Sequence, residues 1–461
     1  MKLHFYGGAR MVTGSNYILE TSLGKIMIDC GLFQGRREIE EKNYEPFPYK
    51  PSEIGFVLIT HAHLDHLGRL PKLIKEGFNG RILATRPTID FARLMLEDSQ
   101  KIIQKKAAQK GIFPRMDIQQ IDMVMEMFEA AEYDREIKLN EEVSVCFREA
   151  GHVLGSSVIE CKVREQGQEK EKKIVFSGDL GTAGTPILQD PFRIKNADYV
   201  VMESTYGDRL HEARGECKNT IEDVVEETIA RGGVLMIPSF ALERTQQLLY
   251  HFNDLVENSR IPRTPIFVDS PLAIKLTEIY RRHSEYFDKE ALSLIESGDK
   301  IFKFPDLKFT LSTNESRAIN NTPPPKIIIA GSGMSQGGRI IHHELRYLSD
   351  PKNTLLFVTY QAQGTLGRKI FEGAKVIRII GQDVAIRARI EYVGGYSSHA
   401  DQKGLMDWLS SMTEADSSKK PKKVFVCHGE EDSSLGLAEK IKSDFGLAVE
   451  VPRIGDVISL T

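Results

Sequence analysis

Four side chains that can bind a metal ion stand within one short run, His61-Ala62-His63-Leu64-Asp65-His66. The segment before it, Gly55-Phe56-Val57-Leu58-Ile59-Thr60, is apolar and β-branched, which predicts a buried strand. Residues two apart point to the same side of extended backbone. His61 and His63 can therefore serve one ion, while Asp65 and His66, further along the turn, can serve a neighbouring ion. The alternative is a solvated polar loop that is histidine-rich by chance.

Three further residues of the same chemical types stand where other predicted strands end. His152 follows a strand in Glu149-Ala150-Gly151-His152, Asp179 ends one in Ser177-Gly178-Asp179, and His428 ends one in Val426-Cys427-His428-Gly429. Each lies in a glycine-containing loop, where the backbone can approach a bound ion closely. A single histidine at a strand end is usually part of a polar loop. Three such residues beside the His61–His66 run predict a shared metal centre.

The types of ligand indicate a catalytic rather than a structural metal site. All candidate ligands are imidazoles or carboxylates and none is a cysteine thiolate, which fits an open catalytic site. We expect zinc first, and manganese also suits nitrogen and oxygen ligands. Two ions about 3.5–4 Å apart can share a carboxylate and a hydroxide, which forms near neutral pH because metal binding lowers the pKa of water to about 7. Such a pair of ions can hold the oxygens of a phosphodiester.

Length, charge and cysteine content bound the remaining possibilities. A chain of 461 residues predicts two domains, or one domain with a large insertion. A net charge of −4 argues against coating of long nucleic acid by bulk charge but leaves room for a local basic groove. Five cysteines without paired spacing predict buried free thiols in a reducing compartment. No apolar stretch reaches membrane-spanning length and no signal peptide begins the chain, so we expect a cytoplasmic protein without membrane contact.

The pattern of predicted elements changes twice along the chain. The first part is rich in strands, with two helices expected over residues 88–109 and 117–132. From about 208 to 375 strands alternate with helices, which predicts a parallel sheet. After about 376 β-rich segments return, including residues 384–392 and 423–427.

These motifs resemble those of the metallo-β-lactamase superfamily, and specifically its β-CASP nuclease branch, over essentially the whole chain. Asp29 in Asp29-Cys30-Gly31 matches the first superfamily motif, the His61–His66 run the second, His152 the third and Asp179 the fourth. The resemblance implies an αββα sandwich, built from residues 1–207 and 376–461, into which a β-CASP domain with a parallel sheet, residues 208–375, is inserted.

The resemblance also implies the metal ligands. The first ion is expected on His61, His63, His152 and Asp179, and the second on Asp65, His66, Asp179 and His428. Asp29 is expected to brace the ligands without binding metal.

Three more positions match motifs of the β-CASP branch itself. These are Glu203 in Met202-Glu203-Ser204-Thr205, His399 in Ser398-His399-Ala400-Asp401, and His428. The DNA-repair members carry an apolar residue at the position of His428, whereas RNA-cutting members carry histidine, so this chain resembles the latter. His399, oriented by Glu203, is expected to contact the scissile phosphate and protonate the leaving oxygen. The alternative is that His399 is idle beside a helix cap formed by Ser398 or Asp401.

A glycine-rich loop suggests where the RNA backbone binds. Gly331-Ser332-Gly333-Met334-Ser335-Gln336-Gly337-Gly338 follows a predicted strand and precedes a helix, where backbone amides can receive a phosphate. With the resemblance, Ser332, Gly333 and Met334 are expected to contact RNA phosphate. Arg368, beside a further loop, Gly364-Thr365-Leu366-Gly367, is expected to add a cation.

These observations together predict a zinc-dependent ribonuclease that hydrolyses single-stranded RNA in RNA processing or decay, in the manner of an endonuclease. Asp65, His399 and Glu203 are the residues expected to carry catalysis, with two Zn²⁺ or Mn²⁺ ions, in a monomer or homodimer. A small-molecule hydrolase of thioesterase or lactamase type and a DNA nuclease are the alternatives. A third is an inactive RNA-binding partner, against which the complete ligand set argues.

Overall fold

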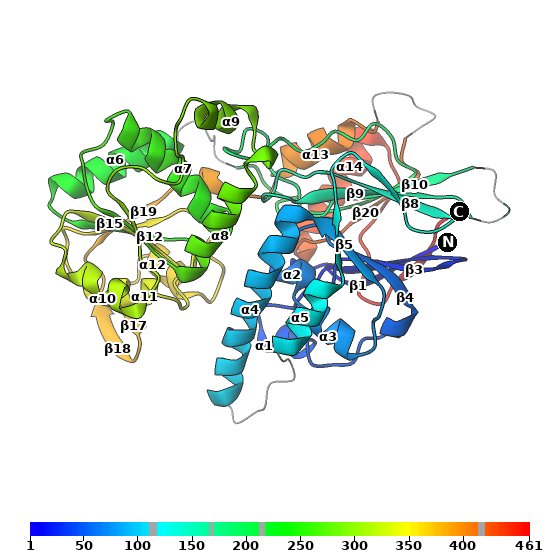
Figure 1. Cartoon of the computed structure of the whole chain (residues 1–461), viewed down its shortest axis with the longest axis horizontal. Helices are drawn as coiled ribbons and strands as arrows, with labels where there is room; N and C mark the ends of the chain where they lie inside the picture. The colour runs from blue at the N-terminus through cyan, green and yellow to red at the C-terminus, as the bar shows by residue number, and fades with distance from the viewer. Residues whose placement is uncertain (110–117, 166, 168–169, 212–216, 414–419) are drawn as a thin grey trace. The chain divides into compact units, whose positions relative to one another are not determined.

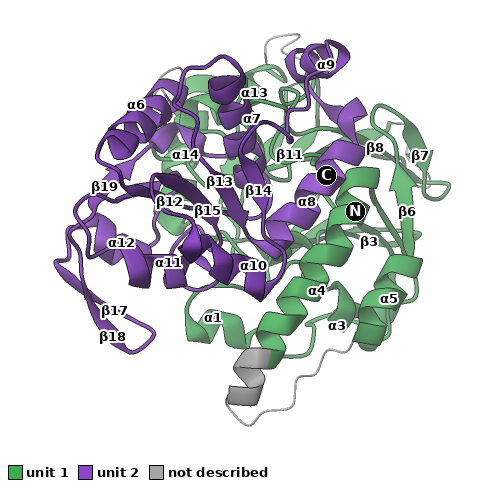
Figure 2. Cartoon of the chain, turned by 60° about the vertical axis from the view of Figure 1, so that its left-hand side comes forward, with its two compact units in different colours: residues 1–210, 399–461 green, residues 211–398 purple. Residues whose placement is uncertain are grey.

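The computed structural model describes residues 1–109, 118–165, 167, 170–211, 217–413 and 420–461. The chain forms two compact units, one of residues 1–210 and 399–461 and the other of residues 211–398 (Figure 2). Each unit has sheets and a core of its own, so each is described separately.

The first unit contains two mixed sheets of seven strands each. In the first sheet β3, β4, β5 and β6 pair in parallel, while β22, β1, β2 and β3 pair antiparallel. Its strands, in spatial order, are β22 (Val457–Ser459), β1 (Lys2–Gly7), β2 (Asn16–Thr21), β3 (Gly24–Ile28), β4 (Ile54–Leu58), β5 (Arg81–Thr85) and β6 (Phe128–Ala131).

In the second sheet β10, β11, β20 and β21 pair in parallel and β7 to β10 pair antiparallel. Its strands, in spatial order, are β21 (Val449–Glu450), β20 (Lys423–Val426), β11 (Tyr199–Met202), β10 (Lys172–Phe176), β9 (Ser157–Val163), β8 (Val143–Glu149) and β7 (Glu136–Lys138).

The main core of this unit lies between the two sheets. Phe5 and Ile28 of the first sheet pack with Phe147, Phe176 and Phe425 of the second in one buried apolar cluster. Both sheets alternate inward and outward side chains, so the outward apolar ones need a second cover. Helices α13 and α14 bury the outer face of the second sheet, and α4 contacts β5 and β6 of the first (Figure 1).

The helices of this unit therefore complete the αββα sandwich that the family resemblance implied. Their bounds are α1 (Arg37–Glu41), α2 (Leu64–Leu67), α3 (Leu70–Lys75), α4 (Arg86–Gln109), α5 (Ile118–Glu126), α13 (Gln402–Ser410) and α14 (Glu431–Phe445).

One predicted helix of this unit is shorter than expected. The sequence predicted a helix over residues 117–132; residue 117 lies outside the described residues, α5 ends at Glu126, and residues 128–131 form strand β6. β6 pairs in parallel with β5, from Ile82↔Phe128 to Thr85↔Ala131. This pairing is a long-range contact that overrides the local helical pattern.

The second unit is built on one six-stranded, wholly parallel sheet. Its strands, in spatial order, are β14 (Leu307–Phe309), β13 (Ile266–Asp269), β15 (Lys326–Ala330), β12 (Val234–Pro238), β16 (Thr354–Phe357) and β19 (Arg389–Tyr392). A separate hairpin joins β17 (Val376–Ile379) to β18 (Gln382–Ala385). The helices are α6 (Cys217–Ala230), α7 (Arg244–Glu257), α8 (Pro271–Arg282), α9 (Lys289–Glu296), α10 (Thr313–Ala318), α11 (Ile340–Tyr347) and α12 (Leu366–Phe371).

The second unit extends further than the sequence indicated. Residues 376–398 were expected to return to the sandwich, but β19 is the edge strand of the parallel sheet and pairs with β16. The local pattern of residues 384–392 predicts β-structure without saying which sheet it joins. Among the described residues, no helix is both long and apolar enough to cross a membrane.

Candidate metal centre

Six strands of the first unit deliver the candidate residues from their carboxyl ends. β3 and β4 pair in parallel, as do β10, β11 and β20, and β9 is antiparallel to both of its neighbours, β8 and β10. The carboxyl ends of these strands therefore point the same way within each sheet. The residues that follow them are Asp29 after β3, His61 after β4, His152 after β8, Asp179 after β10, Glu203 after β11 and His428 after β20.

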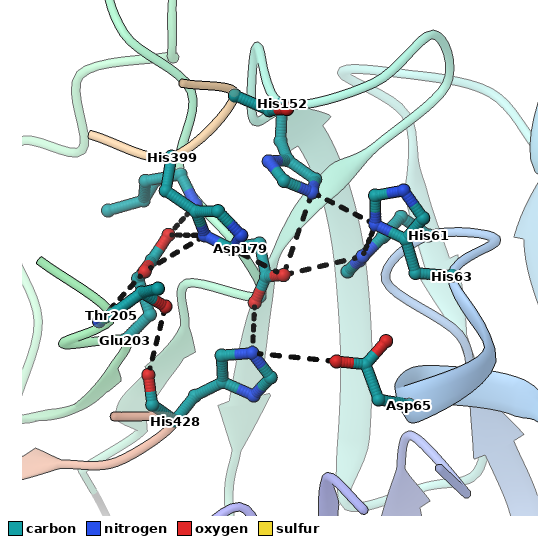
Figure 3. Close-up of polar contacts among 12 residues, drawn as sticks. His61, His63, Asp65, His152, Asp179, Glu203, Thr205, His399 and His428 are labelled. Carbon is teal, nitrogen blue, oxygen red and sulfur yellow. Dashed lines mark hydrogen bonds and ion pairs between the residues drawn. The ribbon is translucent and has the colours of Figure 1, made fainter. Parts of the chain in front are cut away.

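The first group of predicted ligands comes together around one oxygen of Asp179 (Figure 3). His61, His63, His152 and Asp179 each offer one ligand atom, and these atoms all lie within 4.8 Å of one another. Asp179 Oδ2 is 3.5 Å from Nε2 of His61 and 3.6 Å from Nε2 of His152. Nδ1 of His63 is 3.1 Å from the same nitrogens of His61 and His152.

The second group converges on the other oxygen of Asp179. Asp179 Oδ1 is 3.3 Å from Nε2 of His66 and 3.5 Å from Nε2 of His428, and that nitrogen of His428 is 3.8 Å from Asp65 Oδ2. Asp65, His66 and His428 form a second group of ligand atoms within 4.8 Å of one another. Asp179 therefore stands between two sets of imidazoles and directs one oxygen at each.

Two buried polar atoms of the cluster have no hydrogen bond within the protein. Nε2 of His66 and Oδ1 of Asp179 are buried and have no hydrogen-bond partner. An unpaired buried polar group is costly, and such groups in native structures usually mark a bound water or ion. With imidazole and carboxylate donors only, the residues fit a divalent transition metal.

The other ring nitrogens are held by groups outside the ligand sets. Asp29 Oδ2 is 2.7 Å from Nδ1 of His66, and its carboxylate also accepts hydrogen bonds from the backbone N–H and hydroxyl of Thr60 at 2.8 and 2.9 Å. Ser15 Oγ lies 2.8 Å from Nδ1 of His428. A partner at Nδ1 fixes the ring and leaves Nε2 for a metal. The braces at Ser15 and Thr60 were not predicted; Thr60 adjoins His61, but no pattern in the sequence indicates Ser15.

Burial and neighbouring charges shift the pKa values of the imidazoles in opposite directions. Burial lowers the pKa of His63 and of His428 to about 4, and burial with the nearby His66 holds the pKa of His61 well below its usual value. At His66 burial is outweighed by the carboxylates of Asp179 and Asp29, which raise its pKa well above the usual value. Metal binds neutral imidazole, so the raised pKa of His66 opposes metal binding at that ring.

Glu203 and His399 form a pair beside the metal-ligand cluster. Nδ1 of His399 lies 3.1 and 3.2 Å from the two carboxylate oxygens of Glu203, which is buried and also accepts hydrogen bonds from the backbone N–H of Leu180 and Thr205. Although burial opposes it, Glu203 and then Asp179 raise the pKa of His399 to about 9. Asp401 caps α13 by accepting from the Gly404 N–H at 2.9 Å, so the helix cap and the Glu203–His399 pair exist together.

The backbone around the cluster is constrained at two of its members. Asp29 and His428 have φ angles of +60° and +44°. Residues other than glycine adopt this left-handed backbone conformation rarely, and such residues cluster at functional sites. Gly31 is required by close approach, because a Cβ there would lie 1.6 Å from the carbonyl oxygen of Asp65. Gly178, before Asp179, combines a φ of +55° with a Cβ position 2.9 Å from Thr60 Cβ.

The residues predicted to contact RNA phosphate lie in the second unit. Ser332, Gly333 and Met334 occupy the loop between β15 and α11, as expected. The carbonyl of Gly333 accepts hydrogen bonds from the side chains of Thr359 and Gln361, which hold the loop in place. Arg368 lies in α12, where its guanidinium pairs with Glu372 at 2.7 Å.

Fold and site together define a metallo-hydrolase of the metallo-β-lactamase type. Three family models match the chain: a metallo-beta-lactamase superfamily domain over residues 18–179, a Beta-Casp domain over residues 245–370, and a Zn-dependent metallo-hydrolase RNA specificity domain over residues 383–452. The chain belongs to the β-CASP family of the metallo-β-lactamase superfamily.

Several named proteins are similar to this chain over nearly its full length. Ribonuclease TTHA0252 of Thermus thermophilus is 38% identical over 99% of both chains, and an RNase J-like protein of Methanocaldococcus jannaschii is 30% identical over 99% of both. Transcription termination factor FttA of Methanosarcina mazei is 30% identical over 94% of this chain and 68% of its own. A solved structure from Enterococcus faecalis, of unknown function, shares the fold with a TM-score of 0.55 at 13% identity, covering 100% of this chain and 99% of its own.

Proposed function

We propose that this protein is a metal-dependent ribonuclease that hydrolyses phosphodiester bonds of single-stranded RNA in RNA processing or decay. The observation that carries the proposal is the position of Asp179, whose two oxygens face two separate sets of imidazoles. One carboxylate shared between two ligand sets suits a pair of divalent ions, the arrangement used for displacement at phosphorus. The relatives named as ribonucleases support the choice of RNA.

Each ligand set holds one ion in this proposal. His61, His63 and His152 with Oδ2 of Asp179 hold the first, and Asp65, His66 and His428 with Oδ1 of Asp179 hold the second. Zinc is the proposed ion and manganese the substitute, because all ligands are nitrogen or oxygen. When bound, the metal supplies Lewis acidity and lowers the pKa of water.

The pair beside the cluster is suited to handling a proton at the substrate. Glu203 engages Nδ1 of His399, and we assign the phosphate contact to Nε2, on the opposite side of the ring. His399 has a side chain that is 22% exposed, in contrast to the fully buried Glu203, so substrate can reach it. We assign to His399 the contact with the scissile phosphate and protonation of the leaving oxygen, and to Glu203 the positioning of that ring. Ser332, Gly333, Met334 and Arg368 are proposed to bind backbone phosphates.

Three substrates separate this proposal from its alternatives. Purified protein is incubated with single-stranded RNA, with DNA of the same sequence and with a chromogenic lactam, each with and without chelator and after Zn²⁺ or Mn²⁺ is restored. We expect cleavage of RNA alone, lost with chelator and regained with metal. Faster cleavage of DNA, or turnover of the lactam without cleavage of RNA, would overturn the assignment.

A circular substrate tests the proposed endonuclease mode. A covalently closed single-stranded RNA has no end from which an exonuclease can start. We expect the circle to be opened at a rate comparable to cleavage of the linear RNA of the same sequence. A circle that survives while its linear form is degraded would show an exonuclease instead.

A further inference from the structure

A cavity of about 340 Å³ lies in the first unit, apart from the metal ligands. Its apolar lining consists of Leu32 and Phe33 after β3, Leu64 of α2, and Ile102 and Ile103 of α4. Its volume falls within the range of small-molecule sites, which are mostly apolar with a few placed polar groups. None of the predicted metal ligands lines it.

One residue of the wall, Arg69, carries a guanidinium that has no charge partner among the described residues. Arg69 is only 5% exposed, its Nη2 has no hydrogen-bond partner, and it forms no ion pair with the carboxylates of the described residues. Its Nε donates to the carbonyl of Gly31 at 2.5 Å, and the guanidinium lies 4.5 Å from the ring centre of Phe33. A guanidinium carries five N–H donors, and the two on Nη2 have no acceptor in the protein.

The other charges near Arg69 do not neutralise it. Lys72, also in the wall, pairs with Glu76 at 3.6 Å and donates to the carbonyl of Glu45. The wall also carries Glu40 and Lys75. Arg69 forms an ion pair with neither glutamate of the wall, so among the described residues its buried charge has no carboxylate partner. A buried charge is costly unless it is paired, so an anion bound in the cavity would relieve this cost.

We propose that this cavity binds a small amphipathic anion, an apolar body that bears one carboxylate, phosphate or sulfonate group. The acidic group would pair with Arg69, and the apolar body would lie against Leu32, Leu64 and Ile103. The site is separate from the proposed ribonuclease chemistry and does not depend on it.

The cavity shares its wall with α2, the short helix that carries the proposed metal ligands Asp65 and His66. The Leu32 N–H donates to the Leu64 carbonyl at 2.7 Å, and the Cys30 N–H donates to the His66 carbonyl at 2.7 Å. Binding at the cavity must therefore be measured with metal saturating and again after chelation, so that an anion on the metal ions is not mistaken for one in the cavity.

A matched pair of probes tests the proposal on the full-length protein. The first is 1-anilinonaphthalene-8-sulfonate, whose fluorescence rises in apolar surroundings, and the second is N-phenyl-1-naphthylamine, the same ring system without the sulfonate. We expect saturable binding of the sulfonate at one site per chain, unchanged by chelator, and binding of the neutral probe weaker by about tenfold or more, as for loss of a charged hydrogen bond.

Two substitutions locate the probe and one controls for surface binding. Arg69→Met keeps the apolar stem and should lower the affinity for the sulfonate probe to that for the neutral probe. Ile103→Trp fills the cavity and should lower the affinity for both probes. Met123→Trp, at a 49% exposed position of α5 that does not line the cavity, should change neither. Because Ile103→Trp keeps Arg69 in place, the test holds if Arg69→Met fails to fold. Sulfonate binding that survives either cavity substitution in a folded protein, or that disappears with chelator, overturns the proposal.

Discussion

The ring of His66 is held at one nitrogen by Asp29, with Nδ1 of the imidazole 2.7 Å from Oδ2 of the carboxylate. Its other nitrogen, Nε2, lies 3.3 Å from Oδ1 of Asp179 and has no hydrogen-bond partner. Asp29 also accepts from Thr60, the residue before His61. One buried carboxylate that belongs to neither proposed ligand set thus contacts the ring of His66 and the residue at the start of the loop that carries His61 and His63.

Asp29→Asn should weaken metal binding without removing a ligand. The amide can accept from Thr60 with its oxygen, but its NH₂ would face donors at His66 and the Thr60 hydroxyl. Loss of such a partner typically costs about 10–100-fold in metal affinity, which competition with a chromogenic chelator measures. Asp444→Asn, an exposed carboxylate paired with Lys440, is the control. Unchanged affinity in the Asp29 variant would remove its bracing role.

Damage to the second ligand set should lower the metal content by about one ion per chain. The wild-type protein should hold about two transition-metal ions per chain, measured by inductively coupled plasma mass spectrometry after dialysis. His428→Ala and Asp65→Ala each remove a member of the second set, so each should retain about one ion and lose activity. A wild-type content of one ion, or no change in the variants, would contradict the two-ion assignment.

His399→Ala should separate metal binding from chemistry. His399 belongs to neither ligand set, so both ions should stay, while loss of a proton donor or phosphate contact typically slows cleavage by about two to four orders of magnitude. RNA binding, measured by fluorescence anisotropy, should be largely kept. Near wild-type cleavage by a fully metallated variant would leave His399 without a catalytic role.

Glu203→Gln should show a milder loss of rate together with a loss of stability. Glu203 is proposed to orient His399, and each of its oxygens also accepts one backbone N–H, from Leu180 or Thr205. An amide NH₂ would confront one of those donors, so we expect a lower Tm as well as a lower kcat. If cleavage falls as far as in His399→Ala while the Tm is unchanged, Glu203 would have a direct role at the substrate.

The second unit should become less stable as pH rises, because of Glu344. This carboxyl is fully buried in α11, where burial, partly offset by a hydrogen bond from Ser335, raises its pKa to about 8. The folded state therefore binds more protons than the unfolded chain, whose glutamate pKa is about 4.3. Stability from this group is complete below pH 4 or so and falls, by at most about 1.4 kcal/mol per pH unit, until pH reaches about 8.

Calorimetry of Glu344→Gln at pH 5 and pH 8 checks this dependence. Glutamine cannot ionise, so the Tm of the variant relative to the wild type should be higher at pH 8 than at pH 5. Glu257→Gln, at an exposed position in α7 of the same unit, should show no such change. A difference in Tm that is the same at both pH values would mean that Glu344 does not titrate in this range.

Local patterns were sufficient for the ligand types and for most elements that carry them. The buried strand before His61 and the strand ends at His152, Asp179 and His428 follow from apolar, β-branched runs that stop at glycine-containing loops. Local patterns failed where pairing was decided at long range, as for β6, which replaced the end of a predicted helix, and β19, which joined the parallel sheet.

The sequence by itself determined the chemistry of the site, because which side chains can bind a metal and which strand ends present them are local properties. Only the tertiary structure decided how those side chains meet. Asp179 divides its oxygens between His61 and His428 because parallel strands of two packed sheets end together, and Ser15 reaches His428 from 413 positions away. The burial of Arg69 is likewise a result of packing, and so is the lack of a hydrogen-bond partner for its Nη2 among the described residues, since both depend on segments that are distant in the chain.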